Sequence, residues 1–193
     1  MFAPQPDETT VLGIDPGLTR CGYAVLRVRQ NTEIKLVSLG VLTTEKTKST
    51  PERLAEVADE FDSLFDQYSP AVLAIEQVFF QANVRTAMSV GQVSGLVLSE
   101  AARRGVEVAQ YSPNQVKLAV AGWGGADKSQ VQKMVKQRLG LSTIPKPADA
   151  ADAAAIALCH VASSPLAMQI AMATHGAKGL AAQELSRASR AIA

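Results

Sequence analysis

The order of strand-like and helix-like segments limits the folds that this chain can adopt. Short apolar runs typical of β-strands come first, at residues 11–15, 21–29 and 33–44, with only short links between them. Further strand-like runs at 71–77 and 106–111 are each preceded by a segment of helical periodicity. Short links favour antiparallel pairing, whereas strands joined through helices pair in parallel by right-handed crossovers. We therefore expect a five-stranded mixed sheet.

Helices should flank this sheet and complete an α/β fold. The first helix follows STPE (49–52), which supplies a cap and a proline for the first turn. Its apolar residues recur at helical spacing: Leu54, Val57, Ala58, Phe61, Leu64 and Phe65. A second helix is expected at 84–104, and three more at 112–121, 127–139 and about 147–162.

Length and composition fit one domain in a reducing compartment. The chain has 193 residues, of which 47% are hydrophobic and 19% charged, enough for a single core. We divide it into an N-terminal extension (1–10), one domain (11–163) and an alanine-rich, loosely ordered tail (164–193). No run approaches the ~20 apolar residues of a membrane span, and the start does not look like a signal peptide. With only two cysteines, Cys21 and Cys159, we expect a cytoplasmic protein without membrane contact.

Charge is unevenly distributed, although the formal net charge is only +1. Residues 52–66 carry six acidic residues against one arginine, while residues 113–140 carry five basic residues against one aspartate. A basic segment of this kind is compatible with a polyanionic partner such as nucleic acid. A solvated helix face is the alternative explanation.

Four acidic residues occupy positions from which they can converge. Asp15 and Glu76 each end a predicted strand, at the edge where open α/β sheets bind ligands. Asp149 and Asp152 are three residues apart in PADAADAAAIALCH (147–160), on one face of a helix's first turn. Each acid could instead cap a helix, favour its dipole or border a turn. That explanation accounts less well for four carboxylates together, because they repel one another unless cations neutralise them.

Magnesium is the cation that such a cluster favours. Mg²⁺ prefers oxygen ligands, usually carboxylates together with phosphate and water oxygens. The histidines, His160 and His175, do not form a zinc-binding pattern. Two Mg²⁺ ions about 3.5–4 Å apart can activate a water molecule and stabilise the leaving oxygen of a phosphodiester. The acids therefore predict a site for two Mg²⁺ ions, in which Mn²⁺ could substitute.

Four segments between about residues 11 and 162 resemble, in order, the motifs of the RuvC family of bacterial Holliday-junction resolvases. They are GIDPGLTRCGYAV, LAIEQVFFQANVRTAMSVGQVSG, YSPNQVKLAVAGWGGADKSQVQKMV and PADAADAAAIALCH. The resemblance implies a ribonuclease-H-like fold, in agreement with the expected order of elements. It also implies that Asp15, Glu76, Asp149 and Asp152 are the catalytic acids that bind divalent metal.

Three further residues are expected at the DNA. Phe79 and Phe80 follow Glu76 in an extended segment, so their rings should point to opposite sides, and one of them should pack in the core. An exposed ring that stacks on a base contributes roughly 1–3 kcal/mol, and the resemblance implicates Phe79 in holding an unstacked base. The resemblance places Lys117 and Lys128 near the scissile backbone, where a cation binds phosphate or offsets developing charge. Solvated lysines on helices are the alternative.

Two features leave alternatives open. Trp123 stands in a loop that the family usually builds from small residues, and it could wedge into the junction or cover a neighbouring helix. Gly91 and Gly95 lie one turn apart in the expected helix 84–104, where each costs about 1 kcal/mol relative to alanine. They indicate close approach of another element, either the sheet or a two-fold related copy of the chain. The resemblance implies a homodimer, and it implies branch-migration helicase subunits as partners.

The function implied by the resemblance is that of a structure-selective endonuclease that resolves four-way DNA junctions in recombination and repair. Paired symmetric nicks by two-metal-ion hydrolysis would leave 5′-phosphate and 3′-hydroxyl ends. One rival is a nucleotide-binding protein of the actin and sugar-kinase type, since GIDPG resembles a phosphate loop. Such proteins need two related halves, and the sequence has no repeat. A second rival, a non-catalytic DNA-binding module, leaves the four acids without a role.

Overall fold

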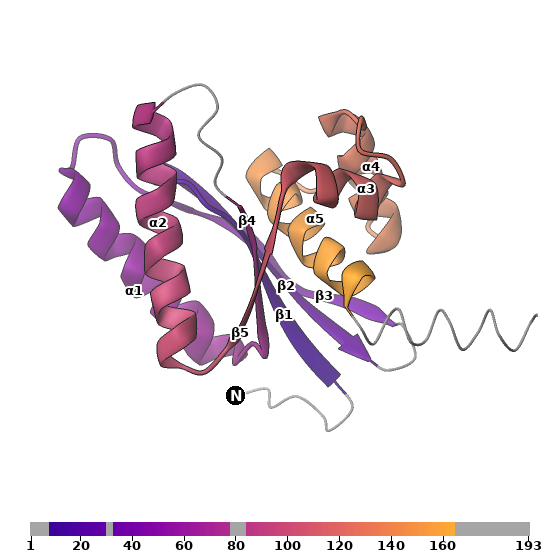
Figure 1. Ribbon diagram of the computed structural model, residues 1–193, viewed down its shortest axis with the longest axis horizontal. Helices are drawn as coiled ribbons and strands as arrows, with labels where there is room; N and C mark the ends of the chain where they lie inside the picture. The colour runs from indigo at the N-terminus through magenta and orange to yellow at the C-terminus, as the bar shows by residue number, and fades with distance from the viewer. Residues whose placement is uncertain (1–7, 30–32, 78–83, 165–193) are drawn as a thin grey trace, which may run out of the picture.

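A mixed five-stranded sheet forms the centre of the molecule, as predicted. The computed structural model describes residues 8–29, 33–77 and 84–164. The strands lie in the order β3-β2-β1-β4-β5 (Figure 1). Antiparallel pairing joins β1 (Glu8–Asp15), β2 (Arg20–Arg29) and β3 (Ile34–Thr43). Parallel pairing joins β1 to β4 (Val72–Glu76) and β4 to β5 (Glu107–Tyr111).

Helices cover both faces of this sheet. One face carries α1 (Thr50–Tyr68) and α2 (Val84–Arg103), and the other carries α3 (Pro113–Ala121), α4 (Lys128–Arg138) and α5 (Ala148–Ser163) (Figure 1). Every helix lies within a few residues of its predicted range. β1 begins before the predicted run 11–15, because Glu8, Thr9 and Thr10 continue the antiparallel ladder with β2. Within the described ranges, no helix is long and apolar enough to cross a membrane.

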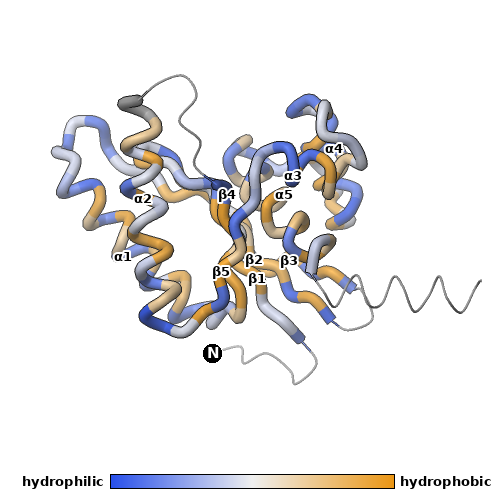
Figure 2. The backbone as a smooth tube through the Cα atoms, in the orientation of Figure 1, coloured by the Kyte–Doolittle hydropathy of each residue, from blue (hydrophilic) through white to orange (hydrophobic). Residues whose placement is uncertain are grey.

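The two faces of the sheet bury separate apolar layers. Because successive residues of a strand point to opposite faces, Leu12 and Ile14 of β1 pack toward α1 and α2, while Val11 packs toward α3–α5. The layer beneath α1 includes the fully buried rings of Phe61 and Phe65. Figure 2 shows the strands as the apolar centre, with polar residues along the outer sides of the helices.

Helix α5 lies very close to the sheet because its contact face consists largely of alanine. A side chain at Gly13 of β1 would place its Cβ 2.8 Å from the Cβ of Ala157. A Cβ at Gly22 of β2 would collide with the backbone carbonyl of Asp149. The glycines of the sheet therefore allow the N-terminal end of α5, which carries Asp149 and Asp152, to rest directly on the sheet.

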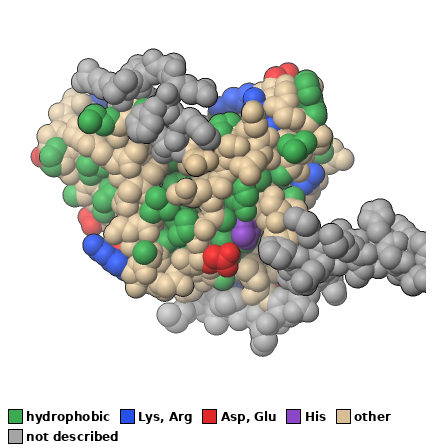
Figure 3. Space-filling view, in the orientation of Figure 1, with side chains coloured by type: hydrophobic (Ala, Val, Ile, Leu, Met, Phe, Trp, Pro, Cys, Tyr) green, Lys and Arg blue, Asp and Glu red, His purple; other side chains and the backbone are tan. Residues whose placement is uncertain are grey.

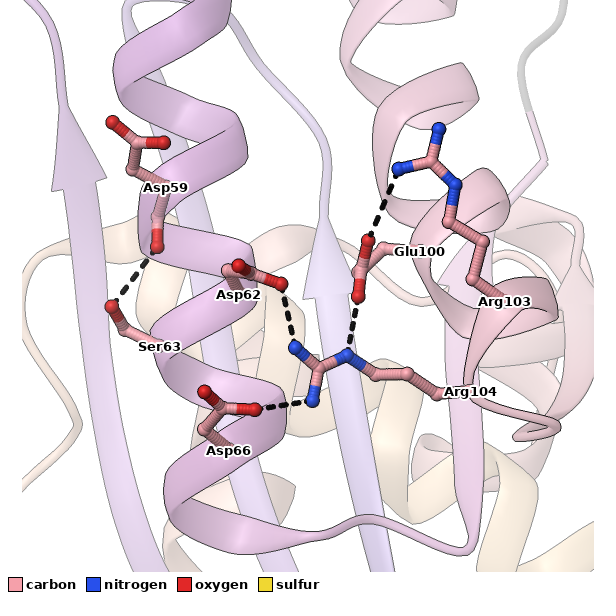
Figure 4. A network of polar contacts seen from close by, with 7 residues as sticks. All are labelled: Asp59, Asp62, Ser63, Asp66, Glu100, Arg103 and Arg104. Atoms are coloured by element: carbon pink, nitrogen blue, oxygen red, sulfur yellow. Dashed lines mark hydrogen bonds and ion pairs between the residues drawn. The ribbon is translucent and has the colours of Figure 1, made fainter.

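On the other face, Arg104 joins α2 to α1 (Figure 4). Its guanidinium bonds Asp62 at 2.6 Å and also pairs with Asp66 and Glu100. The same group lies 5.6 Å from the centroid of the Phe65 ring. A single exposed ion pair is weak, but the pairs with Asp62 and Asp66 both bridge to α1, while Glu100 on α2 orients the same guanidinium. Part of the acidic run 52–66 is thus neutralised within the fold.

Gly91 and Gly95 do not pack on the sheet. Both are exposed on α2, and a Cβ added to either would meet no atom within 4 Å. The sheet side of the helix is formed instead by Val93, Val97 and Ala101, which are fully buried. The first alternative for the two glycines is therefore wrong, and contact with a second copy remains a prediction.

The close approach at Gly22 gives a test of the fold. Gly22→Ala should destabilise the protein by about 1–3 kcal/mol, because the added methyl group forces the first turn of α5 away from β2. Urea unfolding measures this change. Gly124→Ala is the matched control, since its methyl group would meet nothing closer than 4.0 Å. Equal stability of the two variants would contradict the packing described for α5.

Candidate active site

The structure brings all four predicted acids to one edge of the sheet. Asp15 and Glu76 are the last residues of β1 and β4, which run parallel as neighbours, so both carboxylates lie at the same end. Asp149 lies in the first turn of α5, and Asp152 lies one turn further along. The contact of Asp149 with Gly22, which pairs with Asp15 in the sheet, fixes this helix end beside β1.

A cleft of about 410 Å³ opens at this edge. Three of the acids line it, together with both predicted lysines and an apolar wall from α3, α4 and α5; its residues include Asp15, Glu76, Asp152, Lys117, Lys128, Val116 and Ile156. Figure 3 shows a group of basic side chains at the upper side of this view, on the same side of the molecule as the carboxyl end of β4. The cleft therefore combines carboxylates that attract cations with lysines that attract phosphate.

The carboxylates interact electrostatically. Burial, followed by repulsion from Asp152, Glu76 and Asp149, raises the pKa of Asp15 to about 7. Burial and repulsion from Asp152 also raise the pKa of Glu76. These shifts mean that the two strand-end acids pay a free-energy cost for ionising in the metal-free protein, and a bound cation would remove much of that cost.

Each acid of α5 is held by a basic side chain. The Lys128 Nζ donates to Asp152 Oδ2 at 2.6 Å, and this hydrogen bond raises the lysine pKa. The Arg20 Nε donates to Asp149 Oδ2 at 2.8 Å. Sequence reasoning missed Arg20 as a site residue. One signal could have identified it: Arg20 follows Asp15 by only five residues and begins β2, which pairs antiparallel with β1.

The donor set suits Mg²⁺, although the carboxylates are not arranged as a finished metal site. Among the described residues, no three Asp, Glu, His or Cys side chains form a group ready to hold an ion. Four carboxylates provide the hard oxygen ligands that Mg²⁺ prefers, and their mutual repulsion favours a cation between them. The residues present therefore fit magnesium by their chemistry, while Asp149 and Asp152 still face Arg20 and Lys128.

The remaining predicted residues have different outcomes. Lys117 lines the cleft, and Asp127 caps α4 by accepting from the Gln130 backbone at 2.8 Å, which fixes Lys128 as the first helical residue. Trp123 is 55% exposed, and its ring lies against Gly125 of the same loop. Phe79 and Phe80 lie outside the described residues, so their predicted roles stay predictions.

The cysteines do not offer a nucleophile. Cys21 is fully buried, and burial raises the pKa of its thiol to about 12. Cys159 is also fully buried, and its pKa is raised for the same reason. Because the reactive form of cysteine is the thiolate, neither residue suits covalent catalysis.

This sheet order, with acids ending β1 and β4 and a further pair on the last described helix, defines a ribonuclease-H-like fold with an acidic cleft. The family described as crossover junction endodeoxyribonuclease RuvC matches residues 11–160. A RuvC from Leifsonia xyli subsp. xyli is 52% identical over 171 residues, which cover 89% of this chain and 81% of the relative. One from Saccharopolyspora erythraea is 48% identical and covers 92% and 89% of the two chains. The chain belongs to the RuvC family.

Solved structures agree with this assignment. The RuvC of Thermus thermophilus in complex with a Holliday junction substrate superposes with a TM-score of 0.73 at 34% identity, covering 80% of this chain and 94% of that one. The yeast mitochondrial Holliday junction resolvase Ydc2 has a TM-score of 0.62 at 18% identity and shares the fold. The predicted family and the predicted fold are therefore both confirmed.

The raised pKa of Asp15 predicts a pH-dependent stability. Between about pH 4 and pH 7 the folded protein binds the Asp15 proton more tightly than the unfolded chain does, so stability falls as pH rises through this window. Asp15→Asn removes this pH-dependent loss of stability. Without metal at pH 8, the variant should be more stable than the parent by on the order of 2–4 kcal/mol. The gain should be much smaller at pH 4. Urea unfolding in EDTA at both pH values measures it, and a gain of equal size at both would contradict the interpretation.

Proposed function

We propose that this protein is a Holliday-junction resolvase, an endonuclease that cuts phosphodiester bonds at four-way DNA junctions. The observation that carries this proposal is the meeting of four acids from β1, β4 and α5 beside Lys117 and Lys128, in a chain of the RuvC family. The relative from Thermus thermophilus, solved with a Holliday junction substrate, supports the choice of substrate. Family membership also argues against a kinase-like ATPase and against a DNA-binding module without catalysis.

In this proposal Asp15, Glu76, Asp149 and Asp152 hold two Mg²⁺ ions, for which Mn²⁺ could substitute. When bound, such ions activate water for attack on phosphorus and stabilise the leaving oxygen. The strand-end acids are held by the sheet, and the α5 pair is held by a helix that rests on β2. Rigid elements thus position the oxygen ligands, as hydrolysis at a defined phosphate requires.

The basic side chains of the cleft are suited to the DNA backbone. Lys117 and Lys128 line the cleft from α3 and α4, and Lys128 pairs directly with Asp152. A lysine in this place binds phosphate and offsets charge that develops during cleavage. Since the thiol of Cys21 is protonated and buried, we assign the attack to water. With the 3′ oxygen as the leaving group, this hydrolysis gives 5′-phosphate and 3′-hydroxyl ends. Phe79 is proposed to stack on an unpaired base at the crossover.

We also infer a homodimer formed through the outer face of α2. Met88, Gly91 and Gly95 share one side of this helix, and Met88 is 64% exposed. The glycines leave the helix backbone open, so a second helix can approach closely. Two-fold symmetry would place two sites on a junction of matching symmetry, which gives paired nicks. Branch-migration helicase subunits as partners and a cytoplasmic location remain predictions.

The first test of the function uses a synthetic four-way junction and a linear duplex of the same sequence. We expect paired symmetric nicks in the junction with Mg²⁺, little cleavage of the duplex, and no cleavage in EDTA. Gel analysis of end-labelled strands gives both the positions and the chemistry of the ends. Indiscriminate cutting of both substrates would indicate a general nuclease and contradict the proposal.

The roles of the acids are tested separately. Asp15→Asn or Asp149→Asn should reduce junction cleavage at least about a hundredfold while junction binding persists, because the metal ligands are lost but the basic side chains remain. Cleavage assays and gel-shift titrations measure the two properties. Asp59→Asn, on α1, is the control and should cut at the parental rate. Parental cleavage by either site variant would refute the assignment of that residue.

The dimer face is tested by Gly95→Arg. The substitution meets open space within one chain, so the fold should persist, while a second copy should be kept away by the added charge and volume. Sedimentation should then show monomers, and paired nicks should become rare. Gln67→Arg, at an exposed site on α1, is the matched control and should remain dimeric. A dimeric Gly95→Arg protein would exclude this face as the interface.

A further inference from the structure

Arg20 is a charged residue of the site to which the proposed function gives no role. It is the first residue of β2, and its Nε donates to Asp149 Oδ2 at 2.8 Å. The arginine side chain is 45% exposed and the aspartate side chain 30% exposed. The pair therefore lies at the rim of the acidic site, where one partner can move into solvent without leaving a cavity.

The turn before Arg20 fixes its backbone. A Cβ at Gly17 would collide with the Arg20 carbonyl, so the chain folds back tightly on itself there. The hydroxyl of Thr19 accepts from Arg53 Nη2 at 2.7 Å, and the Thr19 carbonyl accepts from the Thr44 backbone at 3.3 Å. Arg53 reaches this turn from the first turns of α1. The backbone at Arg20 is thus anchored, while the side chain is 45% exposed.

Both acids of α5 are held in the same way, whereas the strand-end acids are not. Lys128 pairs with Asp152 at 2.6 Å, as Arg20 pairs with Asp149. Within the described ranges, no basic side chain forms an ion pair with Asp15 or Glu76. Each acid of α5 thus has one cationic partner. Divalent ions would bind the same carboxylate oxygens that these groups now occupy.

We propose that Arg20 is an internal counter-ion that holds Asp149 in the metal-free protein and yields this carboxylate to an incoming divalent ion. This inference rests on the proposed metal site and adds a step to its loading. Its chemical basis is competition: the N–H and positive charge of Arg20 at Asp149 Oδ2 weaken the attraction of this oxygen for a divalent ion, so the oxygen would become a stronger ligand once the guanidinium turned away. Once displaced, the guanidinium stays at the rim of the cleft and can pair with a backbone phosphate, which it fits bidentately.

The inference is tested by metal binding without DNA. Free Mn²⁺ is followed by electron paramagnetic resonance in titrations of the purified protein at low ionic strength. Arg20→Gln should bind Mn²⁺ about 2- to 10-fold more tightly than the parent, because no arginine has to be displaced from Asp149. Unchanged or weaker binding by Arg20→Gln would overturn the inference.

Arg29→Gln is a matched control at the far end of the same strand. Arg29 is 46% exposed and donates to Glu8 at 2.7 Å, so the control removes a similar charge and a similar ion pair away from the site. Its Mn²⁺ affinity should equal that of the parent. An Arg29→Gln effect as large as the Arg20→Gln effect would show that overall charge, rather than the Asp149 pair, controls binding, and would overturn the inference.

A double-mutant cycle separates competition for Asp149 from the general field of a nearby cation. In Asp149→Asn protein, the further change Arg20→Gln should leave the Mn²⁺ affinity unchanged, because the contested carboxylate is gone. A persistent gain in affinity would overturn the inference. Failure of the proposed function looks different, since the parent protein would then not bind Mn²⁺ at the site at all, whatever residue stands at position 20.

Discussion

Repulsion between like charges is the constraint on which this structure depends. Four carboxylates gather at one edge of the sheet, and burial together with their mutual repulsion raises the pKa of Asp15 to about 7. An arrangement of this kind is unfavourable by itself, so the rest of the fold has to supply the stabilisation. Arg20 and Lys128 supply part of it by direct pairing, and we assign the remainder to divalent cations. In the proposed function, the clustering of carboxylates that metal binding requires is therefore opposed by their cost in stability.

Backbone packing is what holds the acids together against that repulsion. The alanine-rich face of α5 lies on Gly13 and Gly22 without intervening side chains, so the helix cannot slide or tilt away without losing contact along its length. On the opposite face, Arg104 joins the ends of α1 and α2 far from the cleft. The sheet thus separates the face that carries α5 and the proposed active site from the face on which Gly91 and Gly95 are exposed.

Much of this could be predicted from local patterns. Strand-like apolar runs and helix-like segments predicted all the described strands and helices, because composition and spacing are local properties of the chain. Acids at the ends of predicted strands indicated a site, since parallel neighbours end at one edge of the sheet. The cap of α1 within STPE (49–52) followed from residue type alone. Gly91 and Gly95 were recognised as unusual, but the pattern could not tell which side of α2 faces the sheet.

By itself the sequence determined the order of elements and the family, and it singled out the four acids, because these depend on residue types and on spacing along one chain. Only the tertiary structure decided which charges meet. Arg20 and Asp149 are 129 residues apart, and their contact exists because α5 rests on β2 at Gly22. The raised pKa of Asp15 likewise arises from burial and from neighbours distant in sequence. Pairing between remote residues depends on packing in three dimensions, which periodicity along the chain does not encode.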